Sequence, residues 1–311
     1  MTNRTNVLFH KERAPATALG QSWHNGGRHV PSPATLANGV PLVFAHRGGR
    51  AIAPENTLVA FDAGIAAGAD GLEFDVHLSR DGQVVIIHDG TLERTTNGTG
   101  SVAERTAAEL AGVVASRRFG IDLEHPWSGA AAGVPTLDSV LARYRDAALI
   151  IEMKGEDTRL GPAVVDAVRR AGASHRVCLG SFSSAVLASA RAAASDIPTS
   201  AGRDESLRAL QRSWFWMSPG TVPYRAFQLP EVSGRLRVVS RRFLRGAHRS
   251  RCAVQVWTVN EEADMRRLFD WGVDGIVTDK PGLGVTVRDA WVQGRLTANS
   301  WPLTKDECED D

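Results

Sequence analysis

From Leu42 onward, the chain alternates short apolar runs with longer segments of helical periodicity, and this alternation strongly constrains its fold. Each apolar run has the length of a buried strand, and the segments between the runs repeat apolar residues every three or four positions. The predicted strands are Leu42–His46, Gly71–Val76, Ala148–Lys154, Val177–Ser181, Pro198–Ala201, Ala226–Leu229, Ala253–Val259 and Gly275–Thr278. The predicted helices are Asn56–Gly68, Leu137–Arg145, Leu160–Ala171, Ser184–Ala194, Glu205–Trp214, Arg241–Arg251 and Glu261–Trp271.

Eight strands with intervening helices in about 250 residues predict an α/β fold of the (β/α)8, or TIM-barrel, type. The alternative is an open doubly wound sheet, but no GxGxxG turn follows the first strand. Asp81-Gly82 is a tight-turn signal before the β-rich run Gln83–His88, so we expect a small hairpin insertion after the second strand. Residues 89–135 then form a long connection, which in a compact domain is usually functional or a small subdomain.

The two ends of the chain depart from the alternating pattern. Residues 1–40 are polar and rich in Gly and Pro, and we expect them to be a poorly ordered lead-in. Residues 41–290 are expected to form the barrel domain. Residues 291–311 are expected to be a C-terminal extension, which ends in the acidic tail Asp306–Asp311.

Charge and composition exclude several functional classes. The 36 basic and 35 acidic residues balance, so nucleic acid is not an expected partner. Cys178, Cys252 and Cys308 form no CxxC pair and no disulfide framework. No run approaches the roughly 20 apolar residues of a transmembrane span. The first 40 residues contain no apolar signal-peptide core, so we expect a cytoplasmic location.

Polar residues inside the predicted strands are informative, because a buried charge is costly unless a partner compensates it. Glu73 and Asp75 stand two residues apart in one strand, so both carboxylates lie on the same face. Glu152 and Lys154 repeat this spacing at the end of another strand. In a parallel barrel, the carboxyl ends of the strands meet on the catalytic face.

Three carboxylates without a thiolate favour a hard cation over zinc. The pattern therefore predicts that Glu73, Asp75 and Glu152 bind one divalent cation, Mg²⁺ or Ca²⁺. The alternative is a buried ion-pair network in which Lys154 neutralises Glu152.

Two histidines lie near the same predicted mouth. His46 ends the first predicted strand and precedes Arg47, and His88 ends the hairpin run. Histidine titrates near neutrality, so a pair of histidines can serve as general acid and general base. Arg47 offers a planar fork that matches phosphate oxygens, and Lys154 offers a second cation. These groups around a divalent cation favour phosphoryl chemistry.

The polar motifs also occur in a characteristic order over residues 42–284. They are His46-Arg47-Gly48, Pro54-Glu55-Asn56-Thr57, Glu73-x-Asp75-Val76, His88-Asp89, Thr91-Leu92-x-Arg94-Thr95-Thr96, Glu152-x-Lys154, Val256-Trp257-Thr258-Val259-Asn260 and Gly275–Pro281. This ordered set resembles the glycerophosphodiester phosphodiesterase (GDPD) family. The resemblance implies a TIM barrel over residues 41–290 that hydrolyses glycerophosphodiesters to sn-glycerol 3-phosphate and an alcohol with Mg²⁺ or Ca²⁺.

The resemblance also implies a role for each matching residue. His46 and His88 correspond to the acid/base pair, and Arg47 and Lys154 to the cations that contact phosphate. Glu55 corresponds to a supporting carboxylate, and Trp257 to an aromatic residue on the substrate side of the mouth. The metal ligands implied by the resemblance are again Glu73, Asp75 and Glu152. The attacking oxygen is either water or a neighbouring hydroxyl of the substrate, and the alcohol moiety stays open.

Two alternatives to this function remain. One is a phospholipase D-like enzyme that acts on lysophospholipids or sphingolipids from the same barrel. The other is a catalytically silent barrel that binds phosphodiesters or a protein, which the intact set of histidines and carboxylates argues against.

The motifs leave two further features unassigned. Arg241, Arg245 and Arg249 share one helix face, and Trp214-Phe215-Trp216-Met217 ends another predicted helix. We expect the arginine-bearing helix to be solvated and the aromatic helix end to pack on the barrel. The alternative is a peripheral contact with anionic lipid.

Overall fold

A computed structural model describes residues 32–35, 37, 39–116, 119, 129 and 132–299. Within this part of the chain, seven parallel strands form one curved sheet in the order β5-β4-β2-β1-β10-β9-β6. The strands are β1 Leu42–His46, β2 Gly71–Leu78, β4 Ala148–Met153, β5 Val177–Gly180, β6 Ala226–Pro230, β9 Ala253–Trp257 and β10 Gly275–Thr278.

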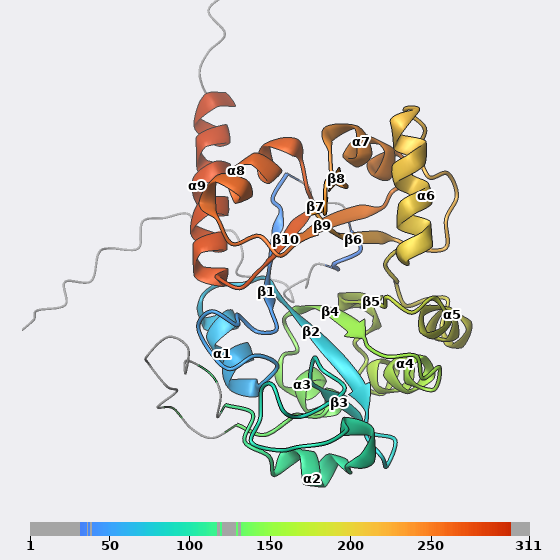
Figure 1. Ribbon diagram of the computed structural model, residues 1–311. Coiled ribbons are helices and arrows are strands. Elements are labelled where there is room, and N and C mark those ends of the chain that lie inside the picture. Colours follow the sequence, from blue (N-terminus) through green and yellow to red (C-terminus); the bar gives the residue numbers. More distant parts are fainter. Residues whose placement is uncertain are drawn as a thin grey trace, which may run out of the picture.

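The gap between β5 and β6 is bridged by the segment predicted as the fifth strand. Thr199 forms a parallel bridge with Leu179, and Ser200 forms one with Ala226. The segment that contains Thr199 and Ser200 thus contributes two isolated bridges and not a full strand. The predicted (β/α)8 barrel is confirmed in this nearly closed form (Figure 1).

Helices surround the sheet, and all of them except α9 were predicted from apolar spacing. They are α1 Leu58–Ala66, α3 Leu137–Arg143, α4 Leu160–Arg170, α5 Ser184–Ala193, α6 Arg203–Trp214, α7 Arg241–Arg249, α8 Glu262–Trp271 and α9 Pro281–Asn299. At four helix starts, a hydroxyl side chain accepts a hydrogen bond from the backbone N–H three residues further on. These N-caps are Thr57, Thr136, Ser183 and Ser240, and they fix where the helices begin.

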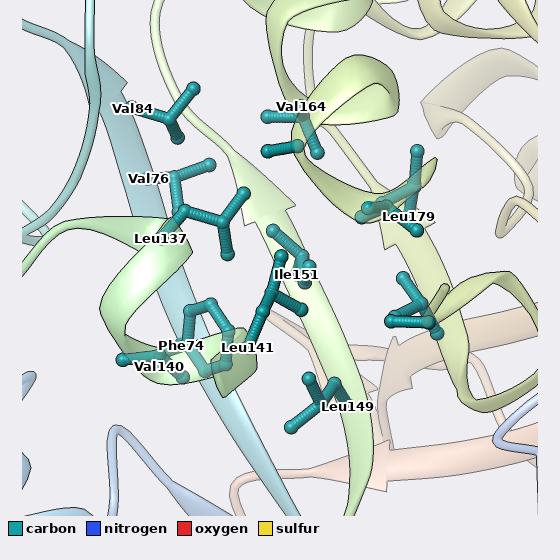
Figure 2. Packing of buried hydrophobic residues seen from close by; sticks show 14 of the residues in the cluster. Phe74, Val76, Val84, Leu137, Val140, Leu141, Leu149, Ile151, Val164 and Leu179 are labelled. Atoms are coloured by element: carbon teal, nitrogen blue, oxygen red, sulfur yellow. The ribbon is translucent and has the colours of Figure 1, made fainter. Parts of the chain in front are cut away.

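Strand alternation separates an apolar layer from a polar interior. Phe74 and Val76 of β2 are buried in the core cluster, together with residues of α3 and α4 (Figure 2). Glu73 and Asp75 alternate with these residues along β2, so their side chains point to the opposite face of the sheet. The core thus fixes which face of β2 carries the carboxylates.

The predicted hairpin is confirmed. β3 Val84–Ile86 pairs antiparallel with the end of β2, and Leu78 lies opposite Val84. The connection that follows contains α2 Ala107–Ala111 and the short 3₁₀ helix Val102–Glu104 in its described part. Its apolar residues form a separate core against β3, which consists of Val85, Ile87, Leu92, Val102, Leu110, Ala115 and Val134. The long connection is therefore a small subdomain.

Both predicted terminal segments contact the barrel where they are described. Pro33 accepts a hydrogen bond at 2.6 Å from the buried side chain of Gln255 in β9, and Ala37 N–H donates to Asp274 at 2.7 Å. At the other end, α9 continues through the expected boundary at residue 290. Trp291 in α9 packs on Phe269 of α8, with the ring centroids 5.8 Å apart. Residues 1–31 and the acidic tail lie outside the described residues.

Candidate active site

Strand register brings the predicted site residues together at the carboxyl ends of β1 and β4 and in the middle of the longer strand β2. His46, the last residue of β1, lies opposite Glu73 of β2. Asp75, two residues further along β2, lies opposite Glu152 of β4. Neighbouring strands are about 4.8 Å apart. The three predicted metal ligands and one of the predicted catalytic histidines therefore lie on adjacent strands.

Asp75 is the most tightly held of the three carboxylates. Its Oδ1 is 3.0 Å from Lys154 Nζ, and its Oδ2 is 3.3 Å from Arg47 Nε. Asn56 Nδ2 donates to Oδ2 at 3.0 Å. Burial alone would raise the pKa of Asp75, but the positive charges of Lys154 and Arg47 outweigh it and lower this pKa. Asp75 is therefore an ionised carboxylate at neutral pH.

At Glu73 and Glu152, the neighbouring positive charges do not outweigh burial. Burial, followed by repulsion from Asp75, raises the pKa of Glu73 to about 7. Burial raises the pKa of Glu152 to about 8, with Lys154 opposing the shift and Asp75 adding to it. In addition, Glu152 Oε1 is buried and has no hydrogen-bond partner among the described residues. Burial therefore disfavours the ionised forms of Glu73 and Glu152 unless a further cation compensates them.

These properties match the needs of a hard divalent cation. The donors are all carboxylate oxygens, which Mg²⁺ and Ca²⁺ prefer, and a cation would satisfy the orphaned oxygen of Glu152. In the described part of the chain, however, no group of three or more His, Cys, Asp or Glu side chains is arranged to hold a metal ion. The register gathers the predicted ligands, but Asp75 is engaged by Lys154, Arg47 and Asn56.

The two predicted catalytic histidines are each anchored by an aspartate. His46 Nδ1 lies 2.6 Å from Asp279 Oδ1, and its Nε2 lies 3.9 Å from Glu73 Oε2. His88 Nδ1 lies 2.6 Å from Asp89 Oδ1. An Nδ1–H that donates to a carboxylate leaves Nε2 of the neutral ring free to accept a proton. Burial lowers the pKa of His88, although Asp75 opposes the shift.

Glu55 lies between two arginines. Arg47 Nη1 donates to Glu55 Oε1 at 2.7 Å, and Arg94 Nη2 donates to the same oxygen at 2.7 Å. Arg94 Nε also donates to Asp89 Oδ2 at 2.5 Å. The chain of contacts Arg47–Glu55–Arg94–Asp89 thus connects a predicted phosphate-binding arginine with the anchor of His88. The left-handed backbone of Arg47, with φ 50°, turns the chain sharply after β1.

An aromatic rim borders the cluster. Trp257 ends β9, and its ring forms an edge-to-face contact with Phe182, with the ring centroids 6.2 Å apart. Lys154 Nζ lies 5.5 Å from the centroid of the Phe182 ring, which is 62% exposed. The mouth therefore offers an apolar wall beside a cation.

Sequence reasoning missed several of these residues, chiefly the anchors. Asp279 follows β10, and Asn260 follows β9; Asn260 Nδ2 donates to Asp279 Oδ2 at 2.8 Å. The signal that identified Glu152, a polar residue at a strand end, could have identified both. Phe182 directly follows the predicted strand Val177–Ser181 and belongs to no motif. The other missed residues, Asn56, Asp89, Arg94, Asn260 and Asp279, all stand inside the ordered motifs.

Comparison with known proteins decides the family. The model of the glycerophosphoryl diester phosphodiesterase family matches residues 46–283. The chain belongs to this family. Its members include the glycerophosphodiester phosphodiesterase of Caldanaerobacter subterraneus subsp. tengcongensis, which is 32% identical over 247 residues and covers 77% of this chain and 94% of its own length.

Two further relatives of this GDPD-family chain have informative names. The structure of an Oleispira antarctica phosphodiesterase in complex with the product sn-glycerol-3-phosphate is 25% identical, with a TM-score of 0.63, and covers 80% of this chain and 97% of that one. A Rattus norvegicus protein named lysophospholipase D is 26% identical over 261 residues, and the match covers 76% of this chain and 83% of the rat protein.

No helix in the described ranges is long and apolar enough to span a membrane.

Proposed function

We propose that this chain hydrolyses glycerophosphodiesters to sn-glycerol 3-phosphate and an alcohol, with a divalent cation and with His46 and His88 as the acid/base pair. The observation that carries the proposal is the pair of histidines, each held at Nδ1 by an aspartate 2.6 Å away at a mouth rich in carboxylates and cations. Membership of the family and the product named for the Oleispira relative support the substrate class.

Each group has a chemical task in this proposal. Arg47 and Lys154 bind the phosphate oxygens and stabilise the charge that develops on them. One histidine takes a proton at Nε2 from the attacking oxygen. The other gives a proton to the alcohol oxygen as the P–O bond breaks. The aspartates hold each ring in the tautomer and orientation that this transfer needs.

Glu73, Asp75 and Glu152 would hold the cation. When bound, the cation neutralises phosphate charge and polarises the phosphoryl group. The raised pKa values of Glu73 and Glu152 and the unpartnered Oε1 of Glu152 support this assignment. Lys154 would then have to share Asp75 with the cation.

The first test is glycerol 3-phosphate release from glycerophosphocholine and glycerophosphoethanolamine, with Mg²⁺, with Ca²⁺ and with excess EDTA. We expect release that needs a divalent cation. His46→Ala or His88→Ala should lower turnover on the order of 10²-fold or more. His175→Ala, a change of an exposed histidine after α4, is the matched control and should leave turnover unchanged. Near-full activity in either site variant would refute its assignment.

A second test measures the cation directly by calorimetric titration of the folded protein. Glu73→Gln and Glu152→Gln should weaken the binding of Mg²⁺ or Ca²⁺, whereas Glu262→Gln on the exposed face of α8 should not. Equal affinities in all three variants would exclude this ligand set.

A second candidate is cleavage of lysophospholipids, which the exposed ring of Phe182 beside Trp257 favours because an acyl chain could lie against this apolar wall. The name of the rat relative belongs to the same class. Choline release from lysophosphatidylcholine, compared with release from glycerophosphocholine, separates the two candidates. If the acylated substrate is preferred, Phe182→Ser should reduce that preference. If only the deacylated substrate is cleaved, the second candidate is excluded.

A further inference from the structure

Four consecutive large apolar side chains protrude where α6 ends. Trp214, Phe215, Trp216 and Met217 are 49%, 72%, 55% and 43% exposed, and we call this segment the aromatic tip. The expectation that this helix end packs on the barrel is therefore wrong. The buried face of α6 ends at Ser213, and the backbone then turns through Trp216, whose φ is 60°.

Arginines of α7 contact the aromatic tip. The guanidinium groups of Arg242 and Arg245 lie 4.4 and 4.7 Å from the centroid of the Trp216 ring. Arg249 Nη2 donates to the Trp216 carbonyl at 2.6 Å, and Arg242 Nη1 donates to the Trp214 carbonyl at 3.1 Å. The Trp216 ring and the backbone of the tip therefore rest on a cationic base.

Positive charge far exceeds negative charge in this region of the described chain. Residues 206–251 contain ten arginines and one acidic residue, Glu231. No carboxylate among the described residues forms an ion pair with the arginines that flank the tip, which are Arg212, Arg241, Arg242, Arg245 and Arg249. Elsewhere on the described surface, Arg159, Arg169 and Arg266 each pair with an aspartate or glutamate.

We propose that the aromatic tip and its flanking arginines dock onto a bilayer that contains anionic lipid. Tryptophan and phenylalanine partition into the boundary between headgroups and acyl chains, and arginine binds the phosphates above it. The unpaired charge favours an anionic partner over a second copy of this chain, because a two-fold contact would bring the same arginines face to face.

Topology gives the docked molecule a definite orientation. The tip connects the end of α6 to the start of β6, so it lies at the amino ends of the strands, beside α7 (Figure 1). The histidines and carboxylates lie at the carboxyl ends. The active-site mouth therefore points away from the bilayer, where water-soluble substrates reach it.

The test is sedimentation of the full chain with vesicles of phosphatidylcholine alone or mixed with phosphatidylglycerol. We expect binding to the anionic vesicles only, and weaker binding at higher salt. Arg241→Gln/Arg245→Gln/Arg249→Gln should lower the partition coefficient by about 100-fold, since each arginine near an anionic surface contributes roughly fivefold. Phe215→Ser/Met217→Ser should lower it by about 10-fold or more.

Matched controls separate this surface from net charge and general hydrophobicity. Arg159→Gln/Arg169→Gln/Arg266→Gln removes the same charge from paired arginines and should retain most of the binding. Val232→Ser removes an apolar side chain that is 46% exposed in the small hairpin after β6 and should also retain it. Hydrolysis of soluble diesters should be unchanged in all of these variants.

Three outcomes would overturn the proposal. The first is no sedimentation of the wild type with anionic vesicles. The second is equal loss in the two arginine triples, which would indicate attraction by net charge alone. The third is a wild-type dimer that Phe215→Ser/Met217→Ser dissociates while vesicle binding is absent, which would assign the tip to a second copy of the chain.

Discussion

The hydrogen bond between Asp279 and His46 can be tested by an isosteric change, Asp279→Asn. The outcome depends on Asn260, because its Nδ2 donates to Asp279 Oδ2 while its Oδ1 accepts from the Asp279 N–H and from Thr278 Oγ1. Asn260 is therefore fixed with its NH₂ toward residue 279. A new amide at 279 must turn its oxygen toward Asn260 and its NH₂ toward His46 Nδ1.

This orientation reverses the tautomer of His46. Because the new NH₂ donates to Nδ1 of His46, Nδ1 must accept and can carry no proton. The ring proton therefore moves to Nε2, and the lone pair that faces the mouth is lost. The change also removes the carboxylate that stabilises an imidazolium. Because acid/base catalysis by one group contributes about 10²–10⁴-fold, we expect kcat/KM to fall about 10³-fold, which is about 4 kcal/mol.

The assay is glycerol 3-phosphate release, together with nitrogen NMR of the histidine tautomers. Asp279→Asn/Asn260→Ala frees the amide to rotate, so part of the lost activity should return in the double variant. Asp138→Asn, an exposed change on α3, is the control and should leave kcat/KM unchanged. The reasoning is refuted if a folded Asp279→Asn protein keeps wild-type kcat/KM, or if His46 keeps its proton on Nδ1.

Three further predictions concern stability and reactivity. The buried guanidinium of Arg176 donates hydrogen bonds to three backbone carbonyl oxygens around the end of α3. Arg176→Met should therefore lower the free energy of unfolding, measured in urea, by about 3 kcal/mol or more. A loss under about 1 kcal/mol would contradict this prediction. Burial would raise the pKa of Asp89, but hydrogen bonds from Arg94 and His88 outweigh it and lower this pKa to about 2. The ionised form of Asp89 therefore stabilises the fold fully above the unfolded pKa of about 4. In denaturant titrations, the difference in stability between wild type and Asp89→Asn should vanish as the pH falls from about 4 to 2. A difference that stays constant over this range would refute the prediction. Burial raises the pKa of Cys178 to about 12 and that of Cys252 to about 11, so mass spectrometry should find neither labelled by a thiol reagent in the native protein and both labelled in urea.

Local sequence patterns predicted most of the architecture, because strand alternation, helical periodicity and turns depend on residues that are close along the chain. Alternation in β2 puts Glu73 and Asp75 on the face opposite to Phe74, since side chains in a strand alternate. The turn at Asp81-Gly82 predicted the hairpin. The seven predicted helices are all present, although their ends differ by a few residues, because cap geometry, which apolar spacing only approximates, sets each boundary.

Local patterns also failed in identifiable places. The fifth strand is reduced to two bridges because only two residues, Thr199 and Ser200, span the gap between β5 and β6. α2 was missed because a five-residue helix has too few apolar positions to show a period. The exposure of Trp214–Met217 could not be predicted, since it depends on where α7 places its arginines.

The sequence by itself determined the barrel, the faces of its strands and the residue types available at their ends. Only the tertiary structure decided which of those ends meet. Strand register sets His46 beside Glu73 and Asp75 beside Glu152, and closure of the sheet brings Asp279 to His46 across 233 residues. The physical reason is that local periodicity depends on neighbours along the chain, whereas register and closure depend on the packing of the whole sheet.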